Sequence, residues 1–342
     1  MNLNEPQLIP NLAILGLFAF GSFLLSMLLT PIYTHFAYKL QWWRKARTQT
    51  VDGKKAEIFQ KLHGAKHKRN IPTMAGMVIL ASVFIITVIF NLERSQTWLP
   101  LFTLMFAGFL GLADDYYVVK TRDKSGGFNA WIQLFLILVI AVLGAYWFYF
   151  KLGASSIHIP AWGNLEIGWL YIPLFIAVMF ATSKSVGITD GLDGLSGGLI
   201  MFAYVAYGVI ALFKGDFGIT AFCLTVAGAM LTYTWFNIYP ARFFMGNSGS
   251  ISLGATLGVI ALLTDSVFVL PIIGFLFFVE SGSSAIQLLS KKFRGKKVFL
   301  IAPIHHHFEA LGWPETKVTM RFWIIGMVTA VIGIVIGVIG RG

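Results

Sequence analysis

Long apolar stretches recur along almost the whole chain, separated by shorter polar segments. An α-helix of about 20 apolar residues spans the hydrocarbon core of a bilayer. The pattern therefore predicts an all-α polytopic membrane protein with about ten transmembrane helices in a single domain, residues 1–342. The predicted helices cover roughly residues 12–38, 72–92, 98–116, 128–150, 168–186, 194–213, 218–237, 250–264, 267–290 and 320–340.

Two of these predicted helices are unusual. The eighth is short, and the ninth is predicted to be interrupted at residues 280–282, where the sequence is Glu-Ser-Gly. The first apolar stretch has neither a basic segment before it nor a small-residue cleavage site after it. It is therefore interpreted as a retained helix and not as a signal peptide.

Basic residues are distributed unevenly between the loops. With ten helices, 22 of the 26 Lys and Arg fall in loops on one side of the membrane. Cytoplasmic loops carry an excess of Lys and Arg, so we expect these loops in the cytoplasm and both termini in the periplasm. The polar motifs described below fall on the same side, which predicts an active site at the cytoplasmic face.

Composition agrees with a membrane protein. Hydrophobic residues make up 57% of the chain and charged residues only 12%, whereas soluble domains carry about 25% charged residues. The net charge of +11 would suggest nucleic acid in a soluble protein, but here it marks one membrane face, and no nucleic-acid partner is expected. The single cysteine, Cys223, excludes an intrachain disulfide.

Adjacent carboxylates, Asp114 and Asp115, end the third predicted helix. Such a pair is repulsive and costly at a membrane boundary, so a compensating cation is expected. Carboxylate oxygens suit Mg²⁺ that bridges to a phosphate. The alternative is a solvated helix end, which is unfavourable for acids because the helix dipole there favours cations.

Two glycine-rich segments are further candidates. Asp190 and Asp193, in TDGLDG, can direct two carboxylates into one space, although each Asp-Gly alone is also typical of a turn. Residues 235–254 run into the eighth helix, and backbone N–H groups of residues 246–250 are placed to bind an anion there. In the alternative interpretation, Ser or Asn only caps that helix.

Histidines, basic residues and one buried acid complete the candidates. His305, His306 and His307 are consecutive, so they point in different directions and cannot all bind one metal ion; we interpret them as partners of a nucleotide diphosphate. Lys68 precedes the second helix and is a candidate phosphate ligand or a topological anchor. Glu280 lies within an apolar stretch, where acids are functional by default, or it stabilises a kink.

Taken in order, the motifs PTMAG, DDY, TDGLDGL, FNIYPARFFMGNSGS and PIHHHFEALGWPE resemble those of the phospho-N-acetylmuramoyl-pentapeptide transferases across essentially the whole chain. This family belongs to the polyprenyl-phosphate N-acetylhexosamine-1-phosphate transferases. The HHHFE and GWPE sequences argue against the related GlcNAc-1-phosphate transferases.

The resemblance implies a Mg²⁺-dependent enzyme of peptidoglycan synthesis in the bacterial inner membrane. Its reaction would transfer phospho-MurNAc-pentapeptide from UDP-MurNAc-pentapeptide to undecaprenyl phosphate, giving lipid I and UMP. A homodimer is compatible with this architecture. The resemblance assigns catalysis to Asp114, Asp115, His305, His306 and His307, substrate binding to Lys68, Asp190, Asp193, Asn237 and Phe244, and metal binding to Asp115 and position 247.

The chain also departs from the family pattern. Asn247 stands where the family has a magnesium-binding Asp. One alternative function is therefore a protein with the same fold but impaired catalysis. A GlcNAc-1-phosphate transferase is another, and a transporter is disfavoured because charges within the apolar stretches are nearly confined to Glu280. The remaining departures are Ala75, Ala130, Ile132, Lys184 and Gly187.

Overall fold

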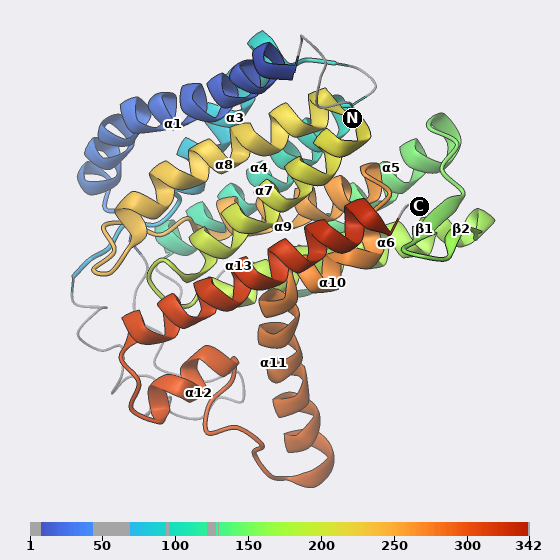
Figure 1. The fold of residues 1–342 in the computed structure, drawn as a ribbon. Coiled ribbons are helices and arrows are strands. Elements are labelled where there is room, and N and C mark those ends of the chain that lie inside the picture. Colours follow the sequence, from blue (N-terminus) through green and yellow to red (C-terminus); the bar gives the residue numbers. More distant parts are fainter. Residues whose placement is uncertain (1–7, 44–68, 94–95, 122–127, 129, 341–342) are drawn as a thin grey trace.

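The computed structural model describes residues 8–43, 69–93, 96–121, 128 and 130–340 (Figure 1). Almost all of these residues are helical. The helices are α1 (Leu8–Lys39), α3 (Gly76–Phe90), α4 (Trp98–Thr121), α5 (Ala130–Tyr146), α6 (Tyr171–Thr189), α7 (Leu195–Lys214), α8 (Phe217–Asn237), α9 (Gly246–Leu263), α10 (Leu270–Ile273), α11 (Phe275–Arg294), α12 (Ile304–Ala310) and α13 (Glu315–Ile339).

The predicted all-α polytopic fold is confirmed. Within the described part of the chain, eight helices are long and apolar enough to cross a membrane. The bent pair Val267–Ile273 and Phe275–Arg294 would make a ninth span, and α3 is a shorter apolar helix. Each of the ten predicted stretches therefore contains a helix.

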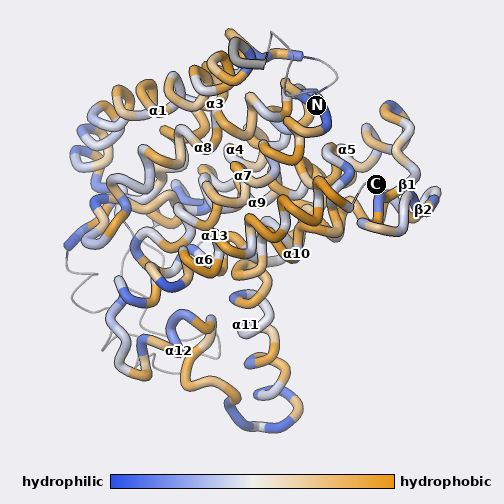
Figure 2. Tube along the Cα trace, in the orientation of Figure 1, coloured by the Kyte–Doolittle hydropathy of each residue, from blue (hydrophilic) through white to orange (hydrophobic). Residues whose placement is uncertain are grey.

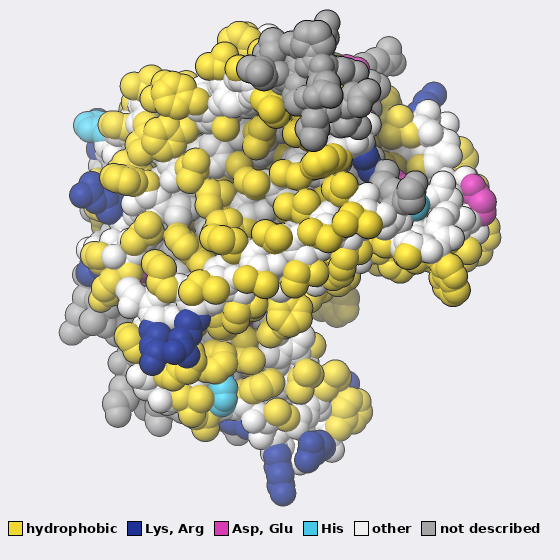
Figure 3. All heavy atoms as spheres, viewed as in Figure 1, with side chains coloured by type: hydrophobic (Ala, Val, Ile, Leu, Met, Phe, Trp, Pro, Cys, Tyr) yellow, Lys and Arg dark blue, Asp and Glu magenta, His cyan; other side chains and the backbone are white. Residues whose placement is uncertain are grey.

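One helix, α9, forms the centre of the bundle. Of its most apolar window, 89% is buried inside the protein, against 17% for α1 and 28% for α13. Figure 2 shows that most of the outer helices are hydrophobic along their length, and Figure 3 shows hydrophobic side chains covering much of the visible face. Because lipid is as apolar as these side chains, an exposed apolar surface of this kind is typical of a membrane-embedded bundle.

The break in the ninth apolar stretch lies at Gly274, so its predicted position at residues 280–282 is wrong. At Gly274, α10 and α11 meet at a bend of 78°. Gly274 separates the two helices, and glycine is a poor helix former, so the chain can turn here. At the predicted site, Ser281 donates to the Phe277 carbonyl and Ser283 to the Glu280 carbonyl, and the helix is continuous.

Between α5 and α6 the chain forms short elements that the apolar pattern did not predict. A π-helix covers Trp147–Lys151, and a hairpin pairs β1 (Ser156–Ile159) antiparallel with β2 (Gly163–Glu166), with Ser156 opposite Glu166. A turn of 3₁₀-helix covers Gly168–Leu170, and a second one, Val267–Val269, lies between α9 and α10. The hairpin lies beside the C-terminal end of α13 (Figure 1), at the opposite end of the bundle from α12.

An apolar cavity of about 330 Å³ lies beside the bend. Its lining includes Val178 of α6, Leu270 and Pro271 of α10, and Ile157 of β1. Ile157 belongs to the hairpin, so this cavity extends toward the hairpin end of the bundle.

Candidate active site

The acid pair of α4 contacts the first turn of α9. The two carboxylate oxygens of Asp115 accept hydrogen bonds from the backbone N–H groups of Asn247 (3.1 Å) and Ser248 (3.0 Å). Gly246 has φ +73°, and a Cβ atom there would lie 2.3 Å from the Asp115 carboxylate. Asp115 therefore caps α9 from a different helix, where a negative charge is favoured by the helix dipole.

Asp114 is placed differently from its neighbour. Its carboxylate accepts hydrogen bonds from the side-chain amide of Asn247 and from the backbone N–H of Phe128. Both acids are fully buried. Because α4 continues to Thr121, the prediction that the pair ends its helix is wrong, and the alternative of a solvated helix end is excluded.

A cation from α6 faces this pair. Lys184 is attracted electrostatically to Asp114 and donates a hydrogen bond to Gln133 Oε1 of α5 at 3.3 Å. Sequence reasoning noted Lys184 only as a departure from the family. Its position inside the apolar stretch of α6 could have identified Lys184 as a site residue, because lysines within membrane helices usually serve a polar site.

Asp114 and Asp115 offer carboxylate oxygens of the kind that Mg²⁺ binds, but the amide at position 247 faces them differently. Mg²⁺ requires oxygen ligands, but Asn247 directs its NH₂ group, not its carbonyl, at Asp114. Both oxygens of Asp115 already accept backbone N–H groups. No group of three His, Cys, Asp or Glu side chains with metal-binding geometry occurs in the described residues.

The TDGLDG segment forms the turn between α6 and α7. Asp190 accepts a hydrogen bond from Ser196 Oγ at 2.5 Å. The buried Asp193 accepts one from the Ala241 N–H at 2.9 Å and lies 3.8 Å from the Arg69 guanidinium. Asp193 therefore joins the turn to the loop before α9, a structural contact that the sequence did not reveal.

Asn237 is used in a similar way. Its side-chain carbonyl accepts a hydrogen bond from the Gly194 N–H (2.9 Å), and its NH₂ donates to the Phe243 carbonyl (2.8 Å). The residue is buried. Since both ends of the amide contact backbone, Asn237 fixes the shape of the site; its predicted role in substrate binding stays a prediction.

The loop before α9 carries Phe244, which is partly buried. Its backbone pairs with the segment before α3: Phe244 N–H donates to the Pro72 carbonyl (2.8 Å), and Ala75 N–H donates to the Phe244 carbonyl (3.0 Å). Lys68, predicted to bind phosphate just before this segment, lies outside the described residues. The next residue, Arg69, is described and partly exposed.

Replacing Phe244 with alanine is expected to weaken UMP binding by about 1–3 kcal/mol, the scale of base stacking on an aromatic ring. The backbone contacts of residue 244 do not depend on its side chain, so the fold should be retained. Calorimetric titration of UMP into the detergent-solubilised protein measures the effect. Unchanged affinity would show that the ring does not stack on the base; Phe293, an exposed aromatic on α11, is a suitable control position.

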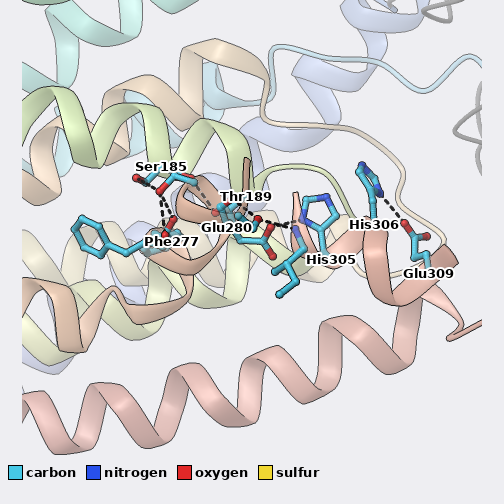
Figure 4. A network of polar contacts seen from close by, with 11 residues as sticks. Ser185, Thr189, Phe277, Glu280, His305, His306 and Glu309 are labelled. Carbon is cyan, nitrogen blue, oxygen red and sulfur yellow. Dashed lines mark hydrogen bonds and ion pairs between the residues drawn. The ribbon is translucent and has the colours of Figure 1, made fainter. Parts of the chain in front are cut away.

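The three histidines lie on α12 and contact three different partners; Figure 4 shows His305 and His306 with theirs. His305 Nδ1 lies 2.8 Å from Glu280 Oε2, and His306 Nδ1 lies 2.7 Å from Glu309 Oε2. His307 Nδ1 accepts the Leu300 N–H at 3.2 Å.

The histidine side chains therefore do not converge on one point, in agreement with the argument against a shared metal ion. Glu309 was not singled out from the sequence. Its position three residues after His306, on the same face of one helix, was the available signal.

Contacts join these motifs into one site at the end of the bundle that carries α12. The acid pair touches the start of α9, Asp193 touches the loop before α9, and the His305 ring packs against Gly191. Segments that are far apart in sequence thus form one largely buried polar cluster with both acids and cations.

Comparisons with known proteins show which family the chain resembles. The glycosyl transferase family 4 model matches residues 97–265. The chain is 35% identical to the phospho-N-acetylmuramoyl-pentapeptide-transferase of Chloroflexus aggregans, over 99% of this chain and 94% of that protein. It is 36% identical to that of a Geobacillus strain and 37% identical to that of Bacillus anthracis, each over 93% of this chain and 96% of the relative. The chain belongs to the phospho-N-acetylmuramoyl-pentapeptide transferase family.

Proposed function

We propose that this chain transfers phospho-MurNAc-pentapeptide from UDP-MurNAc-pentapeptide to undecaprenyl phosphate, giving lipid I and UMP. The observation that supports this best is the convergence of the acid pair, the Asp190–Asp193 turn and the histidine helix at one end of a membrane-spanning bundle. One substrate is lipid-soluble and the other is water-soluble, so a site at the membrane surface is required.

The proposed chemistry brings two anionic substrates together. Lys184 and Arg69 supply positive charge that lowers their mutual repulsion. Asp114 is the carboxylate that we propose acts on the acceptor phosphate, as a proton acceptor or by orienting it. Asp115 holds the start of α9 and thereby the position of Asn247.

For the cofactor, we propose that this chain binds Mg²⁺ more weakly than a chain with Asp at position 247 would. Two facing carboxylates need a cation between them to offset their repulsion. An amide opposite Asp114 removes that need, because its N–H group bonds the carboxylate directly. Mg²⁺, when bound, would supply charge neutralisation for the phosphates.

A transfer assay tests the proposed reaction. The solubilised protein is incubated with radiolabelled UDP-MurNAc-pentapeptide and a polyprenyl phosphate, and labelled lipid is extracted. UDP-GlcNAc serves as the competing donor. Lipid-linked product from the MurNAc donor alone supports the proposal, and product from UDP-GlcNAc alone would assign the chain to the GlcNAc-1-phosphate transferases.

We further propose that the site faces the cytoplasm of a bacterial inner membrane. A reporter fused within loop 291–319 is therefore expected to read cytoplasmic, and one fused after Gly342 to read periplasmic, because Lys and Arg favour the cytoplasmic side. A cytoplasmic signal at the C-terminus would contradict this orientation. A homodimer is also proposed, which light scattering of the detergent complex would test.

A further inference from the structure

One face of α11 carries a polar stripe: Glu280, Ser283, Gln287 and Ser290. Residues three and four apart lie on the same face of a helix, and all four are buried although α11 projects from the bundle (Figure 1). The opposite face is apolar and exposed, with Leu289 54% and Phe293 75% accessible. The stripe must therefore contact another part of the chain.

That contact is the segment returning from α11 to α12. Gln287 Oε1 accepts the N–H groups of Val298 and Phe299, and its Nε2 donates to the Phe299 carbonyl. Ser290 donates to the Lys296 carbonyl at 2.9 Å. The polar stripe thus binds the returning segment, residues 296–299, to α11 by hydrogen bonds from side chain to backbone.

At the bundle end of the stripe, the contacts reach α12 itself. Ser283 Oγ accepts the N–H of Ile304, the first residue of α12, at 3.0 Å. Glu280 Oε2 lies 2.8 Å from His305 Nδ1, and both side chains are fully inaccessible. Figure 4 shows the Glu280 carboxylate and the His305 ring pointing toward each other.

The far side of the His305 ring touches the nucleotide end of the site. His305 Nε2 has no hydrogen-bond partner within the described residues. It lies so close to Gly191 that a Cβ atom there would be 2.3 Å from it. The ring therefore lies between Glu280 and the turn that carries Asp190 and Asp193, and it contacts both.

A buried carboxylate is strongly destabilising unless a donor satisfies it. His305 Nδ1 bonds one oxygen, Oε2, while Glu280 Oε1 has no hydrogen-bond partner within the described residues. The buried carboxyl group therefore depends on the bond to His305 and on the orientation of that ring. A contact of this type between a carboxylate and an imidazole fixes which ring nitrogen carries the proton. The pair thus fixes both the position of the ring and the proton at Nδ1.

We propose that Glu280 is a positioning residue of the active site: through His305 it fixes the turn at Asp190–Asp193 and hence the binding of the nucleotide substrate. The proposal deepens the proposed transferase function and rests on it for the identity of the nucleotide. The base of α11 is also joined to α6 by a hydrogen bond of 2.9 Å between Ser185 and Ser281, so α11 contacts the helix that leads into the Asp190–Asp193 turn as well as α12.

Two substitutions separate positioning from packing. Glu280→Ala removes the acceptor for Nδ1–H, whereas Glu280→Gln keeps an acceptor oxygen and the side-chain volume. At metal sites, replacing a residue that holds a ligand in place typically lowers metal affinity or activity by about 10–100-fold. We expect Glu280→Ala to raise the KM for the nucleotide substrate about tenfold, at the lower end of that range, and to change the KM for polyprenyl phosphate much less. Glu280→Gln should restore most of the loss.

A spectroscopic readout reports on the pair directly. In protein labelled with ¹⁵N-histidine, His305 is expected to show an Nδ1–H signal that is protected from exchange with water. The signal should persist in Glu280→Gln and disappear in Glu280→Ala. Ser290→Ala is the matched control, because Ser290 belongs to the same stripe but does not contact His305; it should leave both the signal and the KM unchanged.

The proposal is overturned if Glu280→Ala retains the protected signal and the KM for the nucleotide. It is also overturned if Glu280→Ala and Glu280→Gln lose UMP binding and thermal stability equally, since that would show a role in folding only. Should the unmodified protein lack transferase activity, the proposed function fails, but UMP affinity and the Nδ1–H signal still decide whether Glu280 positions His305.

Discussion

Replacing Asp114 with asparagine is expected to lower the rate of phosphosugar transfer by about 10²–10⁴-fold, the range in which a positioned proton-transfer group contributes. Asparagine has nearly the same volume and can still accept the Phe128 N–H, but it cannot take up a proton or carry the charge. UMP binding should be retained, because Asp114 lies on α4 and the Asp190–Asp193 turn follows α6. Transfer and UMP titration are measured on the same preparation.

The neighbouring acid provides a matched comparison. Asp115 accepts two backbone N–H groups at the start of α9. Asparagine offers only one acceptor oxygen, so Asp115→Asn should leave one of these donors without its partner and lower the free energy of unfolding by about 1–3 kcal/mol.

A transfer rate of Asp114→Asn within tenfold of the unmodified protein would show that Asp114 is not a reacting group.

Introducing aspartate at position 247 is expected to tighten Mg²⁺ binding and to raise transfer at limiting Mg²⁺ by at least about tenfold. The present amide bonds Asp114 directly, whereas a carboxylate there would face Asp114 and require a cation between them. Changes near metal ligands typically alter affinity or activity by about 10–100-fold.

The Mg²⁺ effect has a readout that does not depend on turnover. Asn247→Asp should lower the thermal stability without Mg²⁺, because the two carboxylates repel each other, and should recover it as Mg²⁺ is added. The unmodified protein should respond less to the same titration. Equal Mg²⁺ dependence of stability and transfer in both proteins would place the magnesium site elsewhere, and Asn247 would then serve only to bond Asp114.

Much of the fold follows from the sequence because membrane spans depend on a local property. About 20 consecutive apolar residues make a helix that a bilayer can hold, whatever its neighbours are. All ten predicted helices were therefore found. Shorter elements with no such signature were missed: the hairpin Ser156–Glu166 and the break at Gly274, which was placed six residues too late because the polar Glu280–Gly282 segment resembled an interruption.

The site residues were named from their types and motifs, but their partners could not be derived. Asp114 and Asp115 are adjacent in sequence, yet one contacts the side chain of Asn247 and the other the backbone of α9. Asp193 and Asn237 were predicted to contact substrate, and the backbone groups that they also hold could not be read from the sequence. Contacts between residues more than 40 positions apart depend on how helices pack, which no local pattern encodes.

The sequence by itself determined that this chain is a helical membrane protein with acids, histidines and glycine-rich turns in the order of one transferase family. The tertiary structure alone decided which of these groups meet: Asp115 with the start of α9, Glu280 with His305, and His305 with Gly191. The physical reason is that hydrophobicity acts residue by residue, whereas a buried polar group is stable only beside a specific partner, and that partner is supplied by another helix.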